Sequence, residues 1–244
     1  MRERAPIAKV IGVLVPFFNT AVEPELADLR PPGVSNQTAR FHLDADVLRH
    51  VVDAARNLMP CRPDAFIVGL ATESFPGGLD FLKQGADAIA EATGTRVFTA
   101  SHATHAALGH LGVRRIAVVT PFDEGANAHV RAAFAERGFD VVRLYGLACP
   151  TLDAIGRTPS EDVRRAFRAA DCDAAEAVVQ VGTGLPVLPV LQELEETLRK
   201  PIIACNAASY WQALRELGVR VPVTGFGRLL ALARSREELG SNRG

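Results

Sequence analysis

The chain of 244 residues contains an internal duplication, and this repeat limits the folds that it can adopt. Three segments recur in the same order and at nearly constant spacing: 9–17 (KVIGVLVPF) as 114–122 (RRIAVVTPF), 64–70 (DAFIVGL) as 176–182 (EAVVQVG), and 95–113 as 200–219. Each copy is as long as a complete α/β unit, whereas solenoid repeats are only about 20–50 residues long. We therefore expect two similar lobes, related by a pseudo-twofold axis, with a ligand cleft between them.

Short apolar segments alternate with helical patterns in both copies, as in parallel sheets whose strands are joined by crossover helices. The strands are expected at 10–15, 65–68, 96–99, 116–120, 177–181, 202–204 and 221–224. The helices are expected at 45–58, 79–92, 102–111, 126–137, 159–170, 187–198 and 207–217. Residues 29–43 and 144–159 are the longest irregular segments, and serve as connectors or lids. The sequence thus predicts an α/β fold of two pseudo-symmetric Rossmann-like lobes with parallel sheets.

The boundary between the lobes is expected near residues 112–115, where the first copy ends and the second begins. No low-complexity linker separates the copies. We predict a first lobe at 1–113, joined by the C-terminal segment 222–244, and a second lobe at 114–221.

Composition excludes several classes of function. Hydrophobic residues make up 48% and charged residues 23% of the chain, close to the average for globular proteins. A net charge of −1 provides no field for nucleic acid or anionic membrane. No apolar run approaches the ~18 residues that span a bilayer, and the apolar residues near the N-terminus are not followed by a signal cleavage site. We expect a cytoplasmic protein that binds neither nucleic acid nor membrane; a homo-oligomer remains open.

Cysteine and histidine patterns do not predict a metal site. The four cysteines are scattered without CxxC spacing, so neither a zinc site nor a disulfide framework is indicated. His102 and His105 share a helix face, but no third ligand follows at suitable spacing. The sequence therefore predicts no metal and no cofactor.

Polar or glycine-rich segments follow four of the predicted strands. In parallel sheets, ligands bind beyond the carboxyl ends of the strands, where helix N-termini offer free N–H groups to a carboxylate. The four segments are 16–20 (PFFNT), 69–78 (GLATESFPGG), 121–127 (PFDEGAN) and 182–186 (GTGLP). We expect a small-carboxylate site where these segments meet.

These segments, with 201–211 (PIIACNAASYW), resemble the aspartate/glutamate racemase superfamily, in the branch of maleate cis-trans isomerase and arylmalonate decarboxylase. The resemblance covers about residues 9–230. It implies two Rossmann-like lobes and cofactor-independent chemistry beside a substrate carboxylate. It also implies one or two catalytic cysteines, placed after the second strand of each lobe.

The chain lacks a thiol at both of these positions. The first falls at Leu70 or Gly69, and the second at Gly182 or Val181. The duplication independently aligns Leu70 with Gly182. We therefore expect neither two-cysteine racemisation nor isomerisation through a thiol adduct. We expect Cys205 to be a buried small residue, because free cysteines are commonly buried.

Glu73 is the candidate proton carrier in place of the thiol. Burial would raise the pKa of its carboxyl group toward neutrality, whereas a position in a first helical turn would lower that pKa. Thr72 and Ser74 flank it, and their hydroxyl and N–H groups either form an oxyanion hole or cap a helix. The catalytic candidates are thus Glu73, Thr72 and Ser74.

The substrate-binding candidates lie on both copies. Asn19 resembles the superfamily asparagine that holds a substrate carboxylate, with a structural turn as the alternative. Thr183 lies between Gly182 and Gly184, which let the backbone approach a ligand closely.

Three further candidates come from the second copy. Phe122 replaces a tyrosine of the related proteins and would line a less polar pocket together with Leu185 and Pro186. Asn127 and Asn206 are candidate helix N-caps and candidate ligand contacts.

The sequence favours a cofactor-independent lyase or isomerase that acts, without a catalytic thiol, next to the carboxylate of a small mono- or dicarboxylic acid. Decarboxylase-like and cis-trans isomerase-like reactions both remain open. A proton carrier on one face only favours one-sided proton transfer, as in a stereoselective decarboxylation. The alternative is a protein of the same fold that binds a small carboxylate without transforming it.

Overall fold

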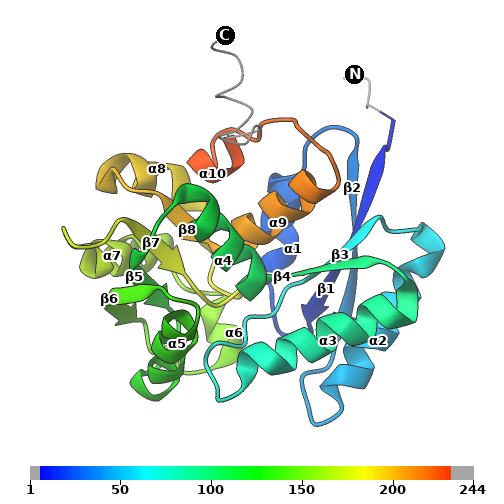
Figure 1. Ribbon diagram of the computed structural model, residues 1–244, viewed down its shortest axis with the longest axis horizontal. Coiled ribbons are helices and arrows are strands. Elements are labelled where there is room, and N and C mark those ends of the chain that lie inside the picture. The colour runs from blue at the N-terminus through cyan, green and yellow to red at the C-terminus, as the bar shows by residue number, and fades with distance from the viewer. Residues whose placement is uncertain (1–5, 232–244) are drawn as a thin grey trace.

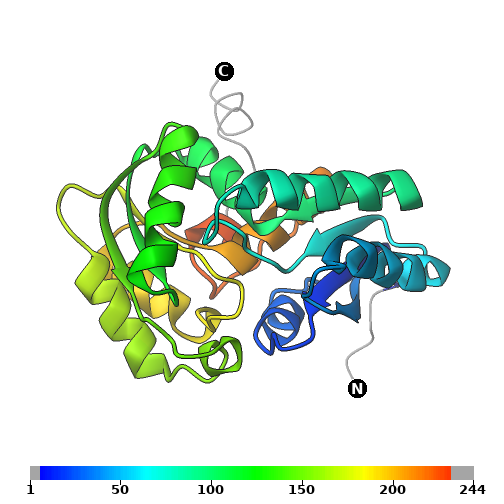
Figure 2. The ribbon, with the colours of Figure 1, turned by 90° about the horizontal axis from the view of Figure 1, so that it is seen from below.

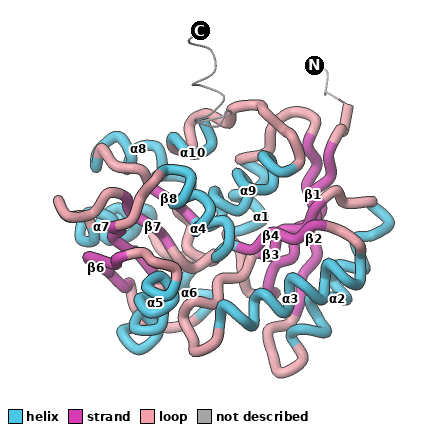
Figure 3. The backbone as a smooth tube through the Cα atoms, in the orientation of Figure 1, coloured by secondary structure: helices cyan, strands magenta, loops and turns pink. Residues whose placement is uncertain are grey.

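The computed structural model describes residues 6–231, which form two parallel four-stranded sheets (Figure 1). The first sheet has the order β2-β1-β3-β4 and the second the order β6-β5-β7-β8. The strands are β1 (Lys9–Pro16), β2 (Val34–Phe41), β3 (Ala65–Val68), β4 (Arg96–Thr99), β5 (Arg115–Thr120), β6 (Asp140–Gly146), β7 (Ala177–Gln180) and β8 (Ile202–Ala204). The magenta strands of Figure 3 gather in these two groups. The identical strand order confirms the two α/β lobes that the repeat predicts.

Helices cover the sheets and join the lobes. They are α1 (Val22–Asp28), α2 (Val47–Leu58), α3 (Gly78–Thr93), α4 (Ala100–Leu111), α5 (Glu124–Glu136), α6 (Leu152–Ile155), α7 (Ser160–Ala170), α8 (Leu188–Leu198), α9 (Cys205–Glu216) and α10 (Arg228–Ala231), with a 3₁₀ turn at Met59–Cys61. The seven predicted helices are all present, within a few residues. Within residues 6–231, none of them is long and apolar enough to cross a membrane.

The hydrophobic core is continuous between the lobes. Alternate residues of β1 point to opposite faces of its sheet: Ile11 and Val13 join the core shared by both lobes, whereas Leu14 packs under α2 and α3. Helices α4 and α9 pack against each other in the middle of the molecule, and α9 also contacts α1, β3 and β4 (Figure 1). The view from below shows the two lobes side by side (Figure 2). The packing of α9 therefore fixes the second lobe against the first.

Of the four edge strands, β4 and β8 lie where the sequence predicts them, whereas β2 and β6 differ from the prediction. β2 lies inside the segment expected to be irregular, and β6 overlaps the second such segment. Each pairs with one neighbouring strand, β2 with β1 and β6 with β5. Their exposed outer edges tolerate polar residues, and so these segments lack the apolar runs by which the other strands were predicted. The strand expected at 221–224 is wrong: Val221 is 47% exposed and Pro222 has no N–H to donate to a ladder.

The described part of the C-terminal segment contacts α8. The N–H groups of Gly227 and Arg228 donate to Gln192 and Glu195 of that helix, at 3.0 and 2.7 Å. These contacts are with the second lobe, whereas we expected the segment to join the first. Residues 232–244 lie outside the described residues, and the division into domains stays a prediction.

Candidate active site

A cavity of about 220 Å³ lies between the lobes, where the carboxyl ends of β1, β3, β5 and β7 meet. This is where parallel α/β sheets place their ligands. Its polar lining includes Asn19, Ser74 and Thr183. Its apolar lining includes Phe18, Leu43, Leu70, Phe75, Phe122 and Ile155. The arrangement suits a ligand with a carboxylate at one end and an apolar group at the other.

Asn19 and Thr183 join the two lobes inside this cavity. The Asn19 amide donates to Thr183 Oγ1 at 3.1 Å, and that hydroxyl donates to the carbonyl oxygen of Gly69 at 2.9 Å. Asn19 Oδ1 accepts the N–H groups of Ala21 and Val22, at 3.0 and 3.1 Å, and so fixes the turn that leads into α1, whose N-cap is Ala21. Both side chains are buried. The structure therefore brings together two of the predicted binding residues, and Asn19 also has the structural role given as the alternative.

Gly182 and Gly184, in the second-lobe turn, are constrained in different ways. Gly182 has φ +106, and a Cβ there would lie 2.7 Å from the Pro121 ring. A Cβ on Gly184 would lie 3.3 Å from Ile155 and 3.8 Å from the Asn19 amide nitrogen. A side chain at position 182 would strain the backbone, so this turn cannot take a thiol without rearranging. Both glycines line the cavity, as predicted.

Phe122 lines the cavity, whereas Asn127 is not among its lining residues. Asn127 Oδ1 accepts the Thr120 hydroxyl at 2.6 Å, and its amide donates to the carbonyl oxygen of Phe122 at 3.3 Å. It is not the N-cap of α5, because Asp123 caps that helix through the N–H of Ala126. Asn127 thus holds the segment that presents Phe122. Leu185, which is fully buried in the core, and Pro186 are not among the lining residues, so their predicted place in the pocket is wrong.

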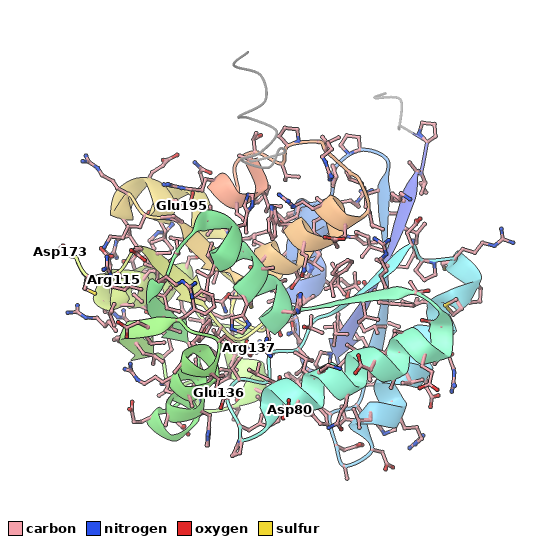
Figure 4. All side chains as sticks on the ribbon, viewed as in Figure 1. Asp80, Arg115, Glu136, Arg137, Asp173 and Glu195 are labelled. Carbon is pink, nitrogen blue, oxygen red and sulfur yellow. The ribbon has the colours of Figure 1, made fainter. Side chains whose placement is uncertain are left out.

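The three catalytic candidates of segment 69–78 face different surroundings. Ser74 lines the cavity, whereas Glu73 lines a separate recess of about 190 Å³. Asp80, Glu136 and Arg137 surround this recess where α3 meets α5 (Figure 4). Thr72 is fully buried behind the cavity. Glu73 and Thr72 are therefore not among the residues that line this cavity, which differs from the prediction, because the turns at 73–77 direct neighbouring side chains to different sides.

Burial raises the pKa of the Glu73 carboxyl group, which is the first of the two alternatives that the sequence left open. The Ser101 hydroxyl and the N–H groups of residues 73 and 72 oppose this rise. Glu73 precedes α3 by several residues, so the helix dipole does not set its pKa. Within residues 6–231, Glu73 Oε2 has no hydrogen-bond partner.

Glu25 is the residue that sequence reasoning missed. Its Oε1 accepts the N–H groups of Val187 and Leu188, at 2.7 and 2.9 Å, and its Oε2 accepts the Asn206 amide at 2.7 Å. Burial raises its pKa to about 7, against the effect of these hydrogen bonds. Glu25 belongs to the pattern NTAVEPE at 19–25, which was the only sequence signal available.

Asn206 has a structural role that differs from the predicted one. It lies inside α9, where Ala204 is the N-cap. Its amide donates both to Glu25 and to the carbonyl oxygen of Thr183, the second at 3.0 Å. Asn206 is not among the residues lining the cavity, so ligand contact is not its role in this conformation.

Cys205 is buried and hydrogen-bonded, which agrees with the prediction. Its thiol donates to Gln180 Oε1 at 3.4 Å, and burial with the nearby Glu73 and Glu25 charges raises the thiol pKa far above its usual value. Such a thiol supplies almost no thiolate at neutral pH.

A sequence profile of the arylmalonate decarboxylase family matches residues 11–230. The arylmalonate decarboxylase of Bordetella bronchiseptica is 32% identical over 234 residues, which is 90% of this chain and 95% of the relative. A maleate isomerase of Geobacillus stearothermophilus is 22% identical over 242 residues, covering 91% and 96% of the two chains.

Solved structures share the fold. A Nocardia farcinica maleate cis-trans isomerase variant with a covalently bound succinylcysteine intermediate has a TM-score of 0.80 and 23% identity, over 91% of this chain and 98% of its own. A liganded arylmalonate decarboxylase variant, with cysteine in place of a glycine and serine in place of a cysteine, has a TM-score of 0.79 and 27% identity, over the same shares of the chains. The chain belongs to the arylmalonate decarboxylase family, in the branch of aspartate/glutamate racemase-like enzymes that also contains maleate isomerases.

Proposed function

We propose that this enzyme is a cofactor-independent decarboxylase, without a catalytic thiol, of malonic acids that carry an apolar substituent. The supporting observation is the division of the cavity into a polar end, at Asn19, Ser74 and Thr183, and an apolar wall that includes Phe122. Malonates fit this division because one carbon bears two carboxylates and the substituent. Burial of the substituent contributes about 25 cal/mol per Å² of apolar surface.

In the proposed reaction, the second amide hydrogen of Asn19 and the backbone N–H of Thr183 hold the carboxylate that is retained, because the Thr183 hydroxyl donates to Gly69. The apolar wall surrounds the other carboxylate, whose charge is less stable when it is removed from water. Its bond to the α-carbon breaks, CO₂ leaves, and the electron pair is delocalised as an enediolate onto the retained carboxylate. A proton is then added to the α-carbon to complete the product.

We assign this proton to the Ser74 hydroxyl, which regains one from solvent water. Ser74 lines the cavity, whereas the Thr183 hydroxyl already donates its proton to Gly69. Glu73 remains a candidate only if segment 69–78 turns its carboxyl group toward the ligand.

The test uses phenylmalonate with the full chain in deuterated water. We expect release of CO₂ and phenylacetate with deuterium at one enantiotopic position of the α-carbon. Equal labelling of both positions, at a rate above spontaneous exchange, would contradict one-sided protonation. Isomerisation of maleate in place of decarboxylation would favour the isomerase reaction.

A carboxylate-binding protein without activity is the second candidate. It is favoured by the absence of all four cysteines from the lining of the cavity. Thermal stabilisation by phenylmalonate or maleate without any product would support it.

A further inference from the structure

Glu25 reaches from the first lobe into the second. It lies on α1, is 5% exposed, and its carboxylate oxygens accept three hydrogen bonds from second-lobe groups. Two of the donors, the N–H groups of Val187 and Leu188, lie at the start of α8, where backbone N–H groups have no partner within the helix itself. A carboxylate is favoured there by the helix dipole as well as by the hydrogen bonds.

These bonds hold both ends of the turn at 182–186, which forms one wall of the cavity. At the far end, Val187 and Leu188 bind Glu25 directly. At the near end, Asn206 connects Glu25 to the carbonyl oxygen of Thr183. Asn19, just before α1, binds the hydroxyl of the same threonine. Helix α1 and Asn19, which precedes it, therefore contact the turn and the residues that follow it, directly or through Asn206, at three places.

We propose that Glu25 is a positioning residue, which acts through Asn206 and the start of α8 to place Thr183 for the retained carboxylate. The role assigned to Thr183 rests on the proposed function, whereas the placement of the turn does not. Glu25 does not line the cavity, so it acts on the ligand only through these contacts.

A merely stabilising role is distinguished by a matched control, Glu195. It is equally buried, at 5% exposure, and its two oxygens accept the N–H groups of Ile202 and Arg228 at 2.8 and 2.7 Å. Glu195 lies on α8 of the second lobe (Figure 4). Among the hydrogen bonds of residues 6–231, its side chain makes none with the turn. Glu25→Gln and Glu195→Gln therefore make the same change at equally buried sites.

In Glu25→Gln, the introduced amide oxygen keeps the bonds to Val187 and Leu188, but the new NH₂ group faces the NH₂ group of Asn206. Asn206 must turn, and the Thr183 carbonyl then loses its donor. We expect kcat/KM for phenylmalonate to fall at least tenfold and amide hydrogen exchange in 182–188 to accelerate at least tenfold. Glu195→Gln should lower Tm but change neither measurement by more than twofold.

The double variant Glu25→Gln/Asn206→Asp separates stability from positioning. The new amide can donate to the new carboxylate at position 206, so the bond between the lobes is restored. That carboxylate cannot donate to the Thr183 carbonyl. We expect Tm to return most of the way to the wild-type value while kcat/KM stays low.

Recovery of kcat/KM together with Tm in the double variant would overturn the proposal. So would wild-type hydrogen exchange in the turn of Glu25→Gln. If the wild-type protein does not decarboxylate phenylmalonate, the proposed function fails, and the exchange comparison between the two single variants still decides the role of Glu25.

Discussion

Glu25 and Glu73 belong to the same lobe and are almost equally buried, at 5% and 3% exposure, but their surroundings differ. Three donors from the second lobe satisfy the Glu25 carboxylate. Glu73 has an unpaired Oε2 within the described residues and lines a recess instead of the ligand cavity. Burial raises the pKa of both groups, so a raised pKa alone does not identify a catalytic acid. The hydrogen-bond partners of each group, and the cavity that it lines, distinguish a carboxylate that positions other residues from one that does not.

The largest expected effect is on stability. Glu25→Ala leaves three buried donors without partners, and should lower the free energy of unfolding by about 3–5 kcal/mol. Glu73→Ala breaks no comparably paired contact, and should lower it by no more than about 1 kcal/mol. Urea unfolding of both variants at one pH measures the difference. Equal losses would show that the two carboxylates are not energetically different.

Stability should fall as the pH rises toward neutrality. Burial raises the pKa of Glu25 from 4.5 in the unfolded chain to about 7, with Asp28 on α1 adding to the rise. The folded state therefore binds more protons than the unfolded chain. The stabilisation that results is fully present below about pH 4.5 and is lost as the pH rises past 7. It amounts to about 3 kcal/mol, from ~1.4 kcal/mol per pKa unit. Glu73 and the Cys205 thiol lie in the same buried region, and Glu73 shifts in the same direction.

Unfolding midpoints from pH 5 to 8 test this linkage. Glu25→Gln should make the profile flatter than that of Glu195→Gln. Parallel profiles in the two variants would mean that Glu25 stays charged throughout this range.

The next effect is on rate. Ser74→Ala should lower kcat for phenylmalonate on the order of 100-fold, the usual contribution of a positioned proton donor. Ser101→Ala, which removes a buried hydroxyl outside the cavity, is the control and should lower kcat less than threefold. Similar rates in Ser74→Ala and the wild type would remove Ser74 from the reaction.

The sequence predicted the central strands because they are buried on both faces and read as continuous apolar runs. It also predicted the edge strands β4 and β8, which end in buried residues, but it missed the edge strands β2 and β6, whose residues are mostly half-exposed and include polar ones. Asn19, Ser74 and Thr183, which line the cavity, could be predicted because strand ends mark the ligand edge of a parallel sheet.

The contact of Glu25 with Asn206 could not be found in the same way. It joins residues 181 positions apart, and depends on how the lobes pack. The direction of the Glu73 side chain could not be predicted either. Glu73 lies in a loop, where no periodicity fixes whether a side chain points to the cavity or to the recess. Sequence periodicity therefore predicts helices, strands and the strand ends at the ligand edge of each sheet, whereas contacts between the lobes can be seen only in the packed structure.

The smallest expected effect is that of Glu73→Gln on the reaction. The carboxyl group lies in a separate recess, so its replacement by an amide of the same size should change kcat for phenylmalonate less than threefold. Because the pKa of Glu73 is raised by burial, the change also removes one group whose ionisation opposes folding as the pH rises. Steady-state rates and unfolding midpoints at pH 8 give both quantities, with Glu195→Gln as the buried control. A loss of 100-fold in kcat without a loss of stability would show that segment 69–78 rearranges during turnover and brings Glu73 to the substrate.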